Sequence, residues 1–124
     1  MKFVLSEKPR YWWPVVVRRP DTENAGKIVE ETFKVLFEPQ SRDEAIASQN
    51  QRSQLQTAQE IAAHEHQQLL DVVKSWDEVE DGNKNPIPFT QEVYLQALQQ
   101  SWVRTGIFQA YADSLNGVEA RLGN

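Results

Sequence analysis

The chain has 124 residues, a formal net charge of −5 and no cysteine. Its length suits one domain around a single hydrophobic core, and the lack of cysteine excludes disulfides, thiolate metal sites and a cysteine nucleophile. An acidic total argues against nucleic-acid and membrane-surface binding, because clustered Lys and Arg side chains drive both. No apolar run approaches the roughly 20 residues that span a bilayer, and Glu7 and Lys8 come too early for a signal peptide. We therefore expect a protein that stays in the cytoplasm.

Residues 1–40 have the pattern of a β-hairpin. Residues 11–17 are aromatic and β-branched, and residues 27–37 place apolar and polar side chains alternately, as strands do. The loop 20–26 joins the two stretches. Pro14 lacks an N–H group and so belongs on an edge or at a bulge, which leaves one side of the first strand not fully paired. The apolar residues 3–5 are a candidate for a short third strand.

The sequence becomes helical beyond residue 40. Ser41 and Glu44 form a capping box, which marks a helix start. The apolar residues that follow keep the spacing of one helical stripe: Leu55, Ala58, Ala62, Leu69, Val73 and Trp76. An unbroken helix over residues 41–75 would be about 52 Å long, whereas a globule of this size is only about 35 Å across. The helix must therefore break, bend or protrude, and the polar stretch 47–54 is its weakest part.

Two further helices are expected after a loop that is rich in Asp, Asn, Gly and Pro and covers residues 77–89. Thr90 caps the first of them. The last helix carries the apolar residues between Trp102 and Leu115, and either Gly117 or Gly123 ends it.

The predicted fold class is α+β. An antiparallel β-hairpin module of two or three strands (residues 1–40) precedes a helical module of three to four helices (residues 41–124). The two form one compact domain, in which the Gln-rich residues 47–60 are either helical or flexible. The hairpin module is nearly neutral, whereas the helical module carries a net charge of −6.

No catalytic or metal-binding pattern stands out. His64 and His66 lie two residues apart on a helix, so their side chains point about 200° apart and cannot share an ion. The acidic residues 77–81 lack the ligand spacing of a calcium loop, and a solvated turn explains them better. The sequence contains neither a phosphate-binding glycine loop nor a nucleophile elbow. We expect a protein that is not an enzyme and needs no cofactor.

The aromatic residues point to protein contacts. Trp12 and Trp13 are adjacent, so on a strand one faces the core and the other faces away. A sheet of two or three strands with apolar groups on both faces is marginal by itself. We infer that the chain associates with itself or captures a strand or helix of a partner.

Two stretches carry a family resemblance. The first begins with Trp13-Pro14 and continues to residue 20. It then includes Gly26 and residues 31–37, and it ends at the polar helix start 41–44. The second contains residues 72–82, then Ile87-Pro88-Phe89-Thr90 and a helical tail through Ala110-Tyr111 to 121–124. Together they resemble the small tail assembly chaperones of long-tailed bacteriophages. The similarity covers most of the chain outside residues 47–60, and Glu78 departs from it, where a smaller residue is usual.

The resemblance implies that the protein binds the tape measure protein, keeps it soluble in the host cell cytoplasm and helps to recruit tail tube subunits. It also implies homo-oligomers and no binding to nucleic acid or membrane. We expect a groove for an amphipathic client helix, and a hairpin edge that joins neighbouring copies. The residues predicted for the groove are Trp76, Phe89, Trp102 and Tyr111, and those for the edge are Trp12, Val16 and Arg18.

Two alternatives from other classes fit the same size and charge. One is a small acidic regulatory protein that inhibits a basic partner, for which the acidic stretch 77–81 is the only dense cluster. The other is a structural virion component such as a completion protein, because small virion proteins also use hairpins and oligomerise.

Overall fold

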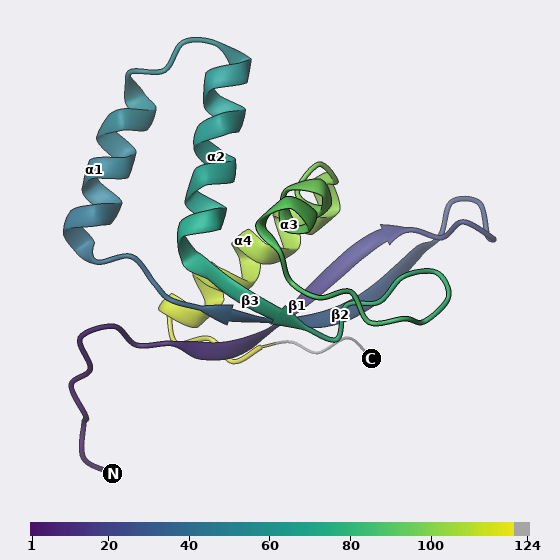
Figure 1. Ribbon diagram of the computed structural model, residues 1–124, viewed down its shortest axis with the longest axis horizontal. Helices are drawn as coiled ribbons and strands as arrows, with labels where there is room; N and C mark the ends of the chain where they lie inside the picture. The colour runs from purple at the N-terminus through teal and green to yellow at the C-terminus, as the bar shows by residue number, and fades with distance from the viewer. Residues whose placement is uncertain (121–124) are drawn as a thin grey trace.

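The computed structural model describes residues 1–120 and shows an α+β fold, as predicted (Figure 1). The terminal residues 121–124, which include the candidate helix end Gly123 and the last part of the family-like tail, lie outside the described residues. The elements follow in the order β1 (Tyr11–Pro20), β2 (Ile28–Phe37), α1 (Arg42–Ser53), α2 (Ala58–Val72), β3 (Val73–Asp77), α3 (Gln91–Ala97) and α4 (Ser101–Leu115).

The predicted hairpin is confirmed. β1 and β2 pair antiparallel with Tyr11 opposite Phe37 and Pro20 opposite Ile28. In the loop, the Asp21 N–H donates to the carbonyl oxygen of Lys27 at 2.9 Å. The strands alternate as expected, because their inward-facing side chains are buried: Val15, Val17, Val35 and Phe37.

The third strand differs from the prediction. The sheet has the order β1-β2-β3, so β3 comes from the helical half of the sequence and pairs with β2. Residues 3–5 form no strand, and the whole arm 1–10 is exposed. The expected helical stripe also ends early, at Val72. The β-branched pair Val72-Val73 favours extended backbone, and the Trp76 indole N–H donates to the carbonyl oxygen of Ile87 at 2.8 Å, which fixes the buried ring beneath the following loop.

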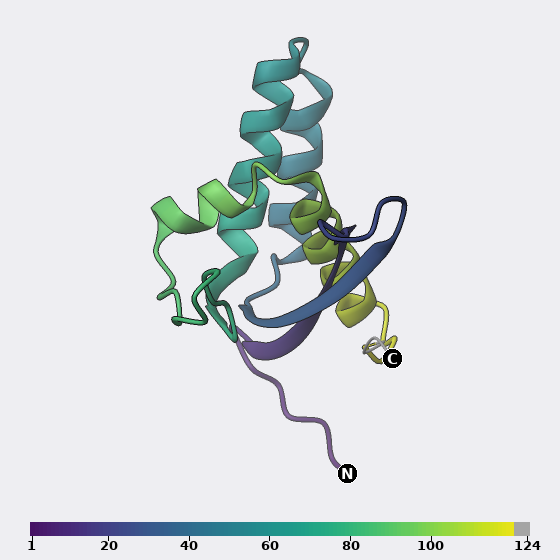
Figure 2. The same ribbon diagram turned by 90° about the vertical axis from the view of Figure 1, so that its right-hand side faces the viewer.

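The long helix both breaks and protrudes. α1 ends at Ser53 and α2 begins at Ala58, so the break follows directly after the weak stretch that the sequence indicated. Figures 1 and 2 show α1 and α2 as a hairpin of helices that projects from the body. The capping box of Ser41 and Glu44 is present, yet α1 contains no buried residue. α1 therefore adds no buried side chain to the core, whereas the end of α2 contributes Leu69 and Val72.

The core lies between the sheet and the helices on one of its faces (Figure 1). Its largest fully buried side chains outside the sheet come from three helices: Leu69 of α2, Tyr94 of α3, Leu98 just after it and Ile107 of α4. The Tyr94 hydroxyl donates to the carbonyl oxygen of Leu69 at 3.0 Å, and burial raises the pKa of that hydroxyl. This bond satisfies the one polar atom of the buried ring.

The start of α3 and the end of α4 agree with the prediction. The Thr90 hydroxyl accepts the Val93 N–H at 3.1 Å at the start of α3. After α4, Gly117 has a φ of 68° and the Val118 N–H donates to the carbonyl oxygen of Asp113 at 2.9 Å. The positive φ explains why glycine ends this helix. Among residues 1–120, no helix is long and apolar enough to cross a bilayer.

Candidate functional site

The candidate site begins where α4 approaches β1. An ideal Cβ atom on Gly106 would lie 2.7 Å from the carbonyl oxygen of Val16 and 3.2 Å from a methyl group of Val15. Only glycine permits this distance, because real Cβ atoms do not come so close to a backbone oxygen. The Val16 carbonyl therefore points toward α4 and away from β2, and the helix lies along the outer edge of the sheet at this point.

A groove of about 940 Å³ lies between β1 and α4. It extends along the helix from Ser101 to Asp113, a length of about 18 Å or roughly three helical turns. The short segment after α4 adds Val118 and Ala120 to its lining. Its apolar lining comes from both elements: Trp13, Pro14 and Val16 of β1, and Trp102 and Ala110 of α4.

Charged and polar groups surround this apolar lining. Arg18 and Glu30 both line the groove and form an ion pair at 3.3 Å. Asp113 lines it from α4, two helical turns beyond Gly106. The Trp102 indole N–H donates to the side chain of Gln100 at 2.8 Å, which orients the half-buried ring. The groove thus combines an apolar interior with charges of both signs, a combination that suits an amphipathic segment.

Three of the predicted site residues come together here, since Val16, Arg18 and Trp102 all line the groove. The prediction assigned Val16 and Arg18 to contacts between copies and Trp102 to the client. The structure places all three side by side. It also puts α4 against the free side of β1 at Val16, where a neighbouring strand would have to lie.

Trp76 and Phe89 lie elsewhere, in an aromatic cluster of the core. Their ring centroids are 5.3 Å apart, and each ring also contacts Tyr94. Trp76 is only 8% exposed, so its role in this arrangement is to fill the core. The expected groove bordered by Trp76, Phe89, Trp102 and Tyr111 is not formed as one surface.

Tyr111 and Trp12 occupy two further places. The Tyr111 ring packs against Phe37 at 5.2 Å, and its hydroxyl accepts the Gln40 N–H at 3.1 Å. Burial is the largest influence on this hydroxyl and raises its pKa. Trp12 is 49% exposed on the face of the sheet that points away from the helices, while Trp13 packs against the core, as the adjacent pair predicted.

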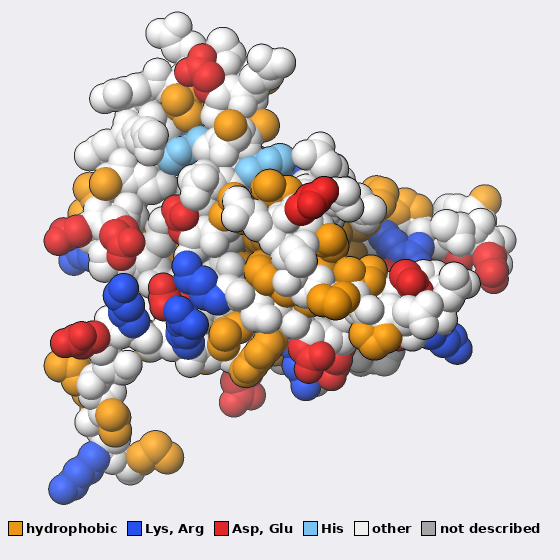
Figure 3. Space-filling view, in the orientation of Figure 1, with side chains coloured by type: hydrophobic (Ala, Val, Ile, Leu, Met, Phe, Trp, Pro, Cys, Tyr) orange, Lys and Arg blue, Asp and Glu red, His pale blue; other side chains and the backbone are white. Residues whose placement is uncertain are grey.

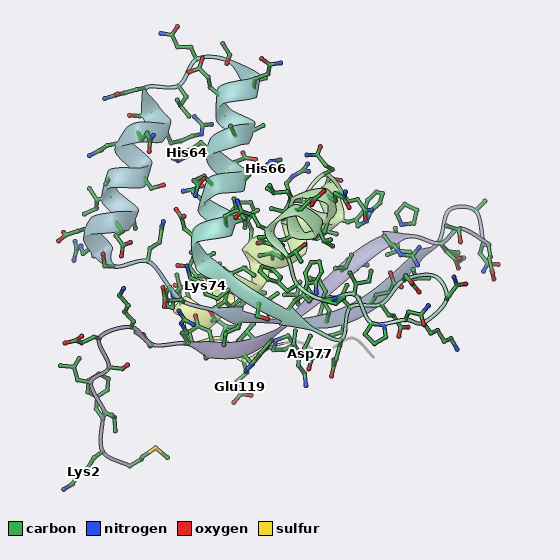
Figure 4. All side chains as sticks on the ribbon, in the orientation of Figure 1. Lys2, His64, His66, Lys74, Asp77 and Glu119 are labelled. Carbon is green, nitrogen blue, oxygen red and sulfur yellow. The ribbon has the colours of Figure 1, made fainter. Side chains whose placement is uncertain are left out.

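A second hollow of about 570 Å³ separates α1 from α2. Most of the residues around it are of polar type and include His64, whose ring nitrogen lies 3.2 Å from the Ser48 hydroxyl. Figure 4 shows His64 directed toward α1 and His66 directed away from it. Within residues 1–120, no three His, Asp or Glu side chains come together as a metal site.

Sequence reasoning missed Trp13, Ala110 and Asp113 as groove residues, and above all Gly106. The available signal was a lone glycine inside an otherwise regular helical stretch, which commonly marks a close approach of two backbones. The partner of that approach, the carbonyl of Val16, lies 90 positions earlier in the sequence. No local pattern connects the two.

Comparisons of this chain with protein-family models, with curated proteins and with solved structures find no match.

Proposed function

We propose that the protein is a tail assembly chaperone, which binds the tape measure protein in the host cell cytoplasm, keeps it soluble and helps to recruit tail tube subunits. The motif resemblance of residues 13–44 and 72–111 supports this proposal. The observation that carries it in the structure is the groove between β1 and α4, because it has the size and chemistry for an amphipathic helix.

The client helix would lie along α4. The groove accommodates about three turns, so two or three apolar side chains of one helical face can enter between Val16 and Trp102. Polar residues on the flanks of the client would meet Arg18 on one side and Asp113 on the other. Gly106 lets α4 come close to β1 at the middle of the groove.

The inhibitor alternative receives no specific support from the acidic stretch. The Asp81 carboxylate accepts the N–H groups of Asn83 and Asn85 at 2.8 and 3.0 Å. Glu78 forms an ion pair with Lys34 at 3.3 Å. Asp81 thus orders its own loop, and Glu78 neutralises a lysine of β2. Mimicry of a phosphate backbone needs instead a regular row of unpaired charges.

Coexpression with a helical fragment of the tape measure protein tests the proposal. We expect the fragment to be insoluble alone and to become soluble and copurify in the presence of the wild-type chain. Val16→Asp and Trp102→Ala should each reduce the recovered fragment at least tenfold, because they place a charge in the groove or remove one of its two indole rings.

Phe108→Ala is the matched control. Phe108 is an exposed aromatic residue of the same helix, 39% exposed and outside the groove, so this variant should retain full recovery. A fragment that stays insoluble with the wild-type chain would overturn the chaperone proposal. Equal recovery with all variants would overturn the assignment to the groove. Detection of the protein in finished virions would favour the structural alternative.

A further inference from the structure

The N-terminal arm is an apolar segment that the chain itself leaves uncovered. Every residue from 1 to 10 is exposed, and Phe3, Val4 and Leu5 are 86%, 82% and 85% exposed. Figures 1 and 2 both show the arm leading away from the body. Three consecutive large apolar side chains in water are unfavourable, and in soluble proteins such a segment usually marks a contact.

β3 offers the arm a place to bind. The sheet has two edges, and β1 is obstructed at Val16 by α4. β3 forms the other edge, two strands away from the place where α4 approaches β1. Among residues 1–120, no backbone group between Lys74 and Asp77 bonds to a segment other than β2. An edge of this kind accepts an added strand through main-chain hydrogen bonds.

The charge at the tip of the arm matches the end of β3 in one direction only. Lys74 lies near the start of β3 and Asp77 at its end, while Lys2 lies at the tip of the arm (Figure 4). An antiparallel arm brings Lys2 to Asp77. A parallel arm would instead place Lys2 beside Lys74, and like charges opposite each other are unfavourable in a strand pair.

Other charged groups nearby strengthen this preference. Glu80 and Asp81 follow β3, so the end that receives Lys2 is acidic. Glu38 and Glu78 also lie close, but they already face basic partners, at 3.8 Å from Lys74 and 3.3 Å from Lys34. The arm contains three basic residues and one acidic residue, whereas the chain as a whole has a net charge of −5. The arm and the body therefore attract each other.

Length and side-chain alternation agree with the same pairing. β3 has five residues, and with Lys2 opposite Asp77 the arm residues 2–6 cover it. Phe3 then lies opposite Trp76, on the face where the core is, and Val4 lies opposite Ser75 on the other face. Figure 3 shows hydrophobic side chains gathered on the surface over β3 and the segments that follow it. Phe3 would extend this cluster.

We propose that residues 2–6 of one copy add to β3 of a second copy as an antiparallel strand. The partner is another copy because the arm points away from its own sheet. This pairing needs no client, so it is independent of the proposed function and fails or succeeds separately from it.

The mass in solution is the first test. Light scattering should give the wild-type chain at least twice the monomer mass of 14.3 kDa, and Phe3→Asp with Leu5→Asp should give the monomer. Both side chains are exposed, so the far-ultraviolet circular dichroism should not change. Ile28→Asp, at an exposed position of β2, should keep the larger mass. A monomeric wild type, or a double variant of unchanged mass, would overturn the proposal.

Cross-linking identifies the two segments. The chain contains no cysteine, so a Val4→Cys chain and a Ser75→Cys chain can be mixed and treated with a short bismaleimide. A cross-link between the two chains is expected. Thr32→Cys, an exposed position on β2, replaces Ser75→Cys in the control and should give at least tenfold less product. Equal yields, or a cross-link that forms only within a chain carrying both cysteines, would contradict pairing between copies.

Charge exchange tests the direction. Lys2→Glu and Asp77→Lys should each weaken the association about twofold to fivefold, as an exposed ion pair of this kind allows. A chain that carries both substitutions should recover the wild-type constant. If the two effects simply add, the antiparallel arrangement is wrong.

Discussion

The carbonyl oxygen of Val16 and the Cα atom of Gly106 face each other so closely that a Cβ atom on Gly106 would lie 2.7 Å from the oxygen. This approach brings α4 against β1 and forms the groove. The prediction is that Gly106→Ala destabilises the protein. Overpacking costs about 1–3 kcal/mol, which outweighs the gain of about 1 kcal/mol that alanine brings to a helix.

Urea denaturation of the two proteins measures this effect, and we expect a net loss of about 1 kcal/mol for Gly106→Ala. Gly82→Ala is the control, because a Cβ atom there would contact nothing within 4 Å, and it should change the free energy of unfolding by less than about 0.5 kcal/mol. A Gly106→Ala protein more stable than the wild type would show that α4 and β1 are less tightly packed.

The sequence allowed the hairpin, its alternation and the caps at Ser41 and Thr90 to be predicted, since each depends on residues close to one another in the chain. Trp76 shows where such reasoning fails. Its spacing from Leu69 and Val73 fits a helical stripe, yet it pairs opposite Val35, about 40 positions away. Buried apolar residues continue from α2 into β3 without a gap. The spacing of apolar residues therefore cannot show where the helix ends and the strand begins.

The candidate site was predicted only in part for the same reason. Val16, Arg18 and Trp102 were recognised individually, but their meeting in one groove depends on the contact between β1 and α4. The strand predicted at residues 3–5 is absent for a different reason. Residues 3–5 have the composition of a strand, but within one chain the place beside β2 is occupied by β3.

The buried hydroxyl of Tyr94 contributes a measurable part of the stability. It donates to the carbonyl oxygen of Leu69 at 3.0 Å, and Tyr94→Phe should lower the free energy of unfolding by about 1 kcal/mol. The loss stays moderate because that carbonyl also accepts the Val73 N–H. The Tyr11 hydroxyl lies 2.7 Å from the hydroxyl of the half-exposed Ser114. Tyr11→Phe should therefore lower the free energy of unfolding by less than Tyr94→Phe does. Equal losses in urea denaturation would contradict this account of the core.

The loss of a helix cap should affect the whole fold at α3 but only the local helix at α1. Removal of either Ser41 or Thr90 by substitution with alanine costs its helix about 1 kcal/mol. α3 carries the buried Tyr94, whereas α1 has no buried residue. Thr90→Ala should therefore lower global stability, while Ser41→Ala should mainly increase amide hydrogen exchange within α1. The opposite assignment of the two effects would mean that α1 belongs to the cooperative core.

Stability should fall in acid. Hydrogen bonds from backbone N–H groups lower the pKa of Asp81 and Glu44, and the Arg10 side chain lowers that of Glu38. A carboxyl group whose pKa is lower in the folded state stabilises the fold above its unfolded pKa, and this stabilisation is lost as the pH falls through the folded value. The ordinary values are 3.8 for Asp and 4.5 for Glu.

We therefore expect the melting temperature to be nearly constant near neutral pH and to decline once the pH falls below about 4.5, the ordinary value for Glu. Asp81→Asn, which cannot be protonated in this range, should decline less steeply. A melting temperature that rises on acidification would show that these three carboxylates are not stabilised in the folded chain.

Isothermal titration calorimetry of the wild-type chain with a helical peptide of the tape measure protein tests the central claim, that the groove between β1 and α4 holds the client. We predict saturable binding with a negative heat-capacity change, as burial of apolar surface requires. Trp102→Ala should weaken it at least tenfold and Phe108→Ala should leave it unchanged. Equal affinity of the wild type and Trp102→Ala for the peptide would contradict the account.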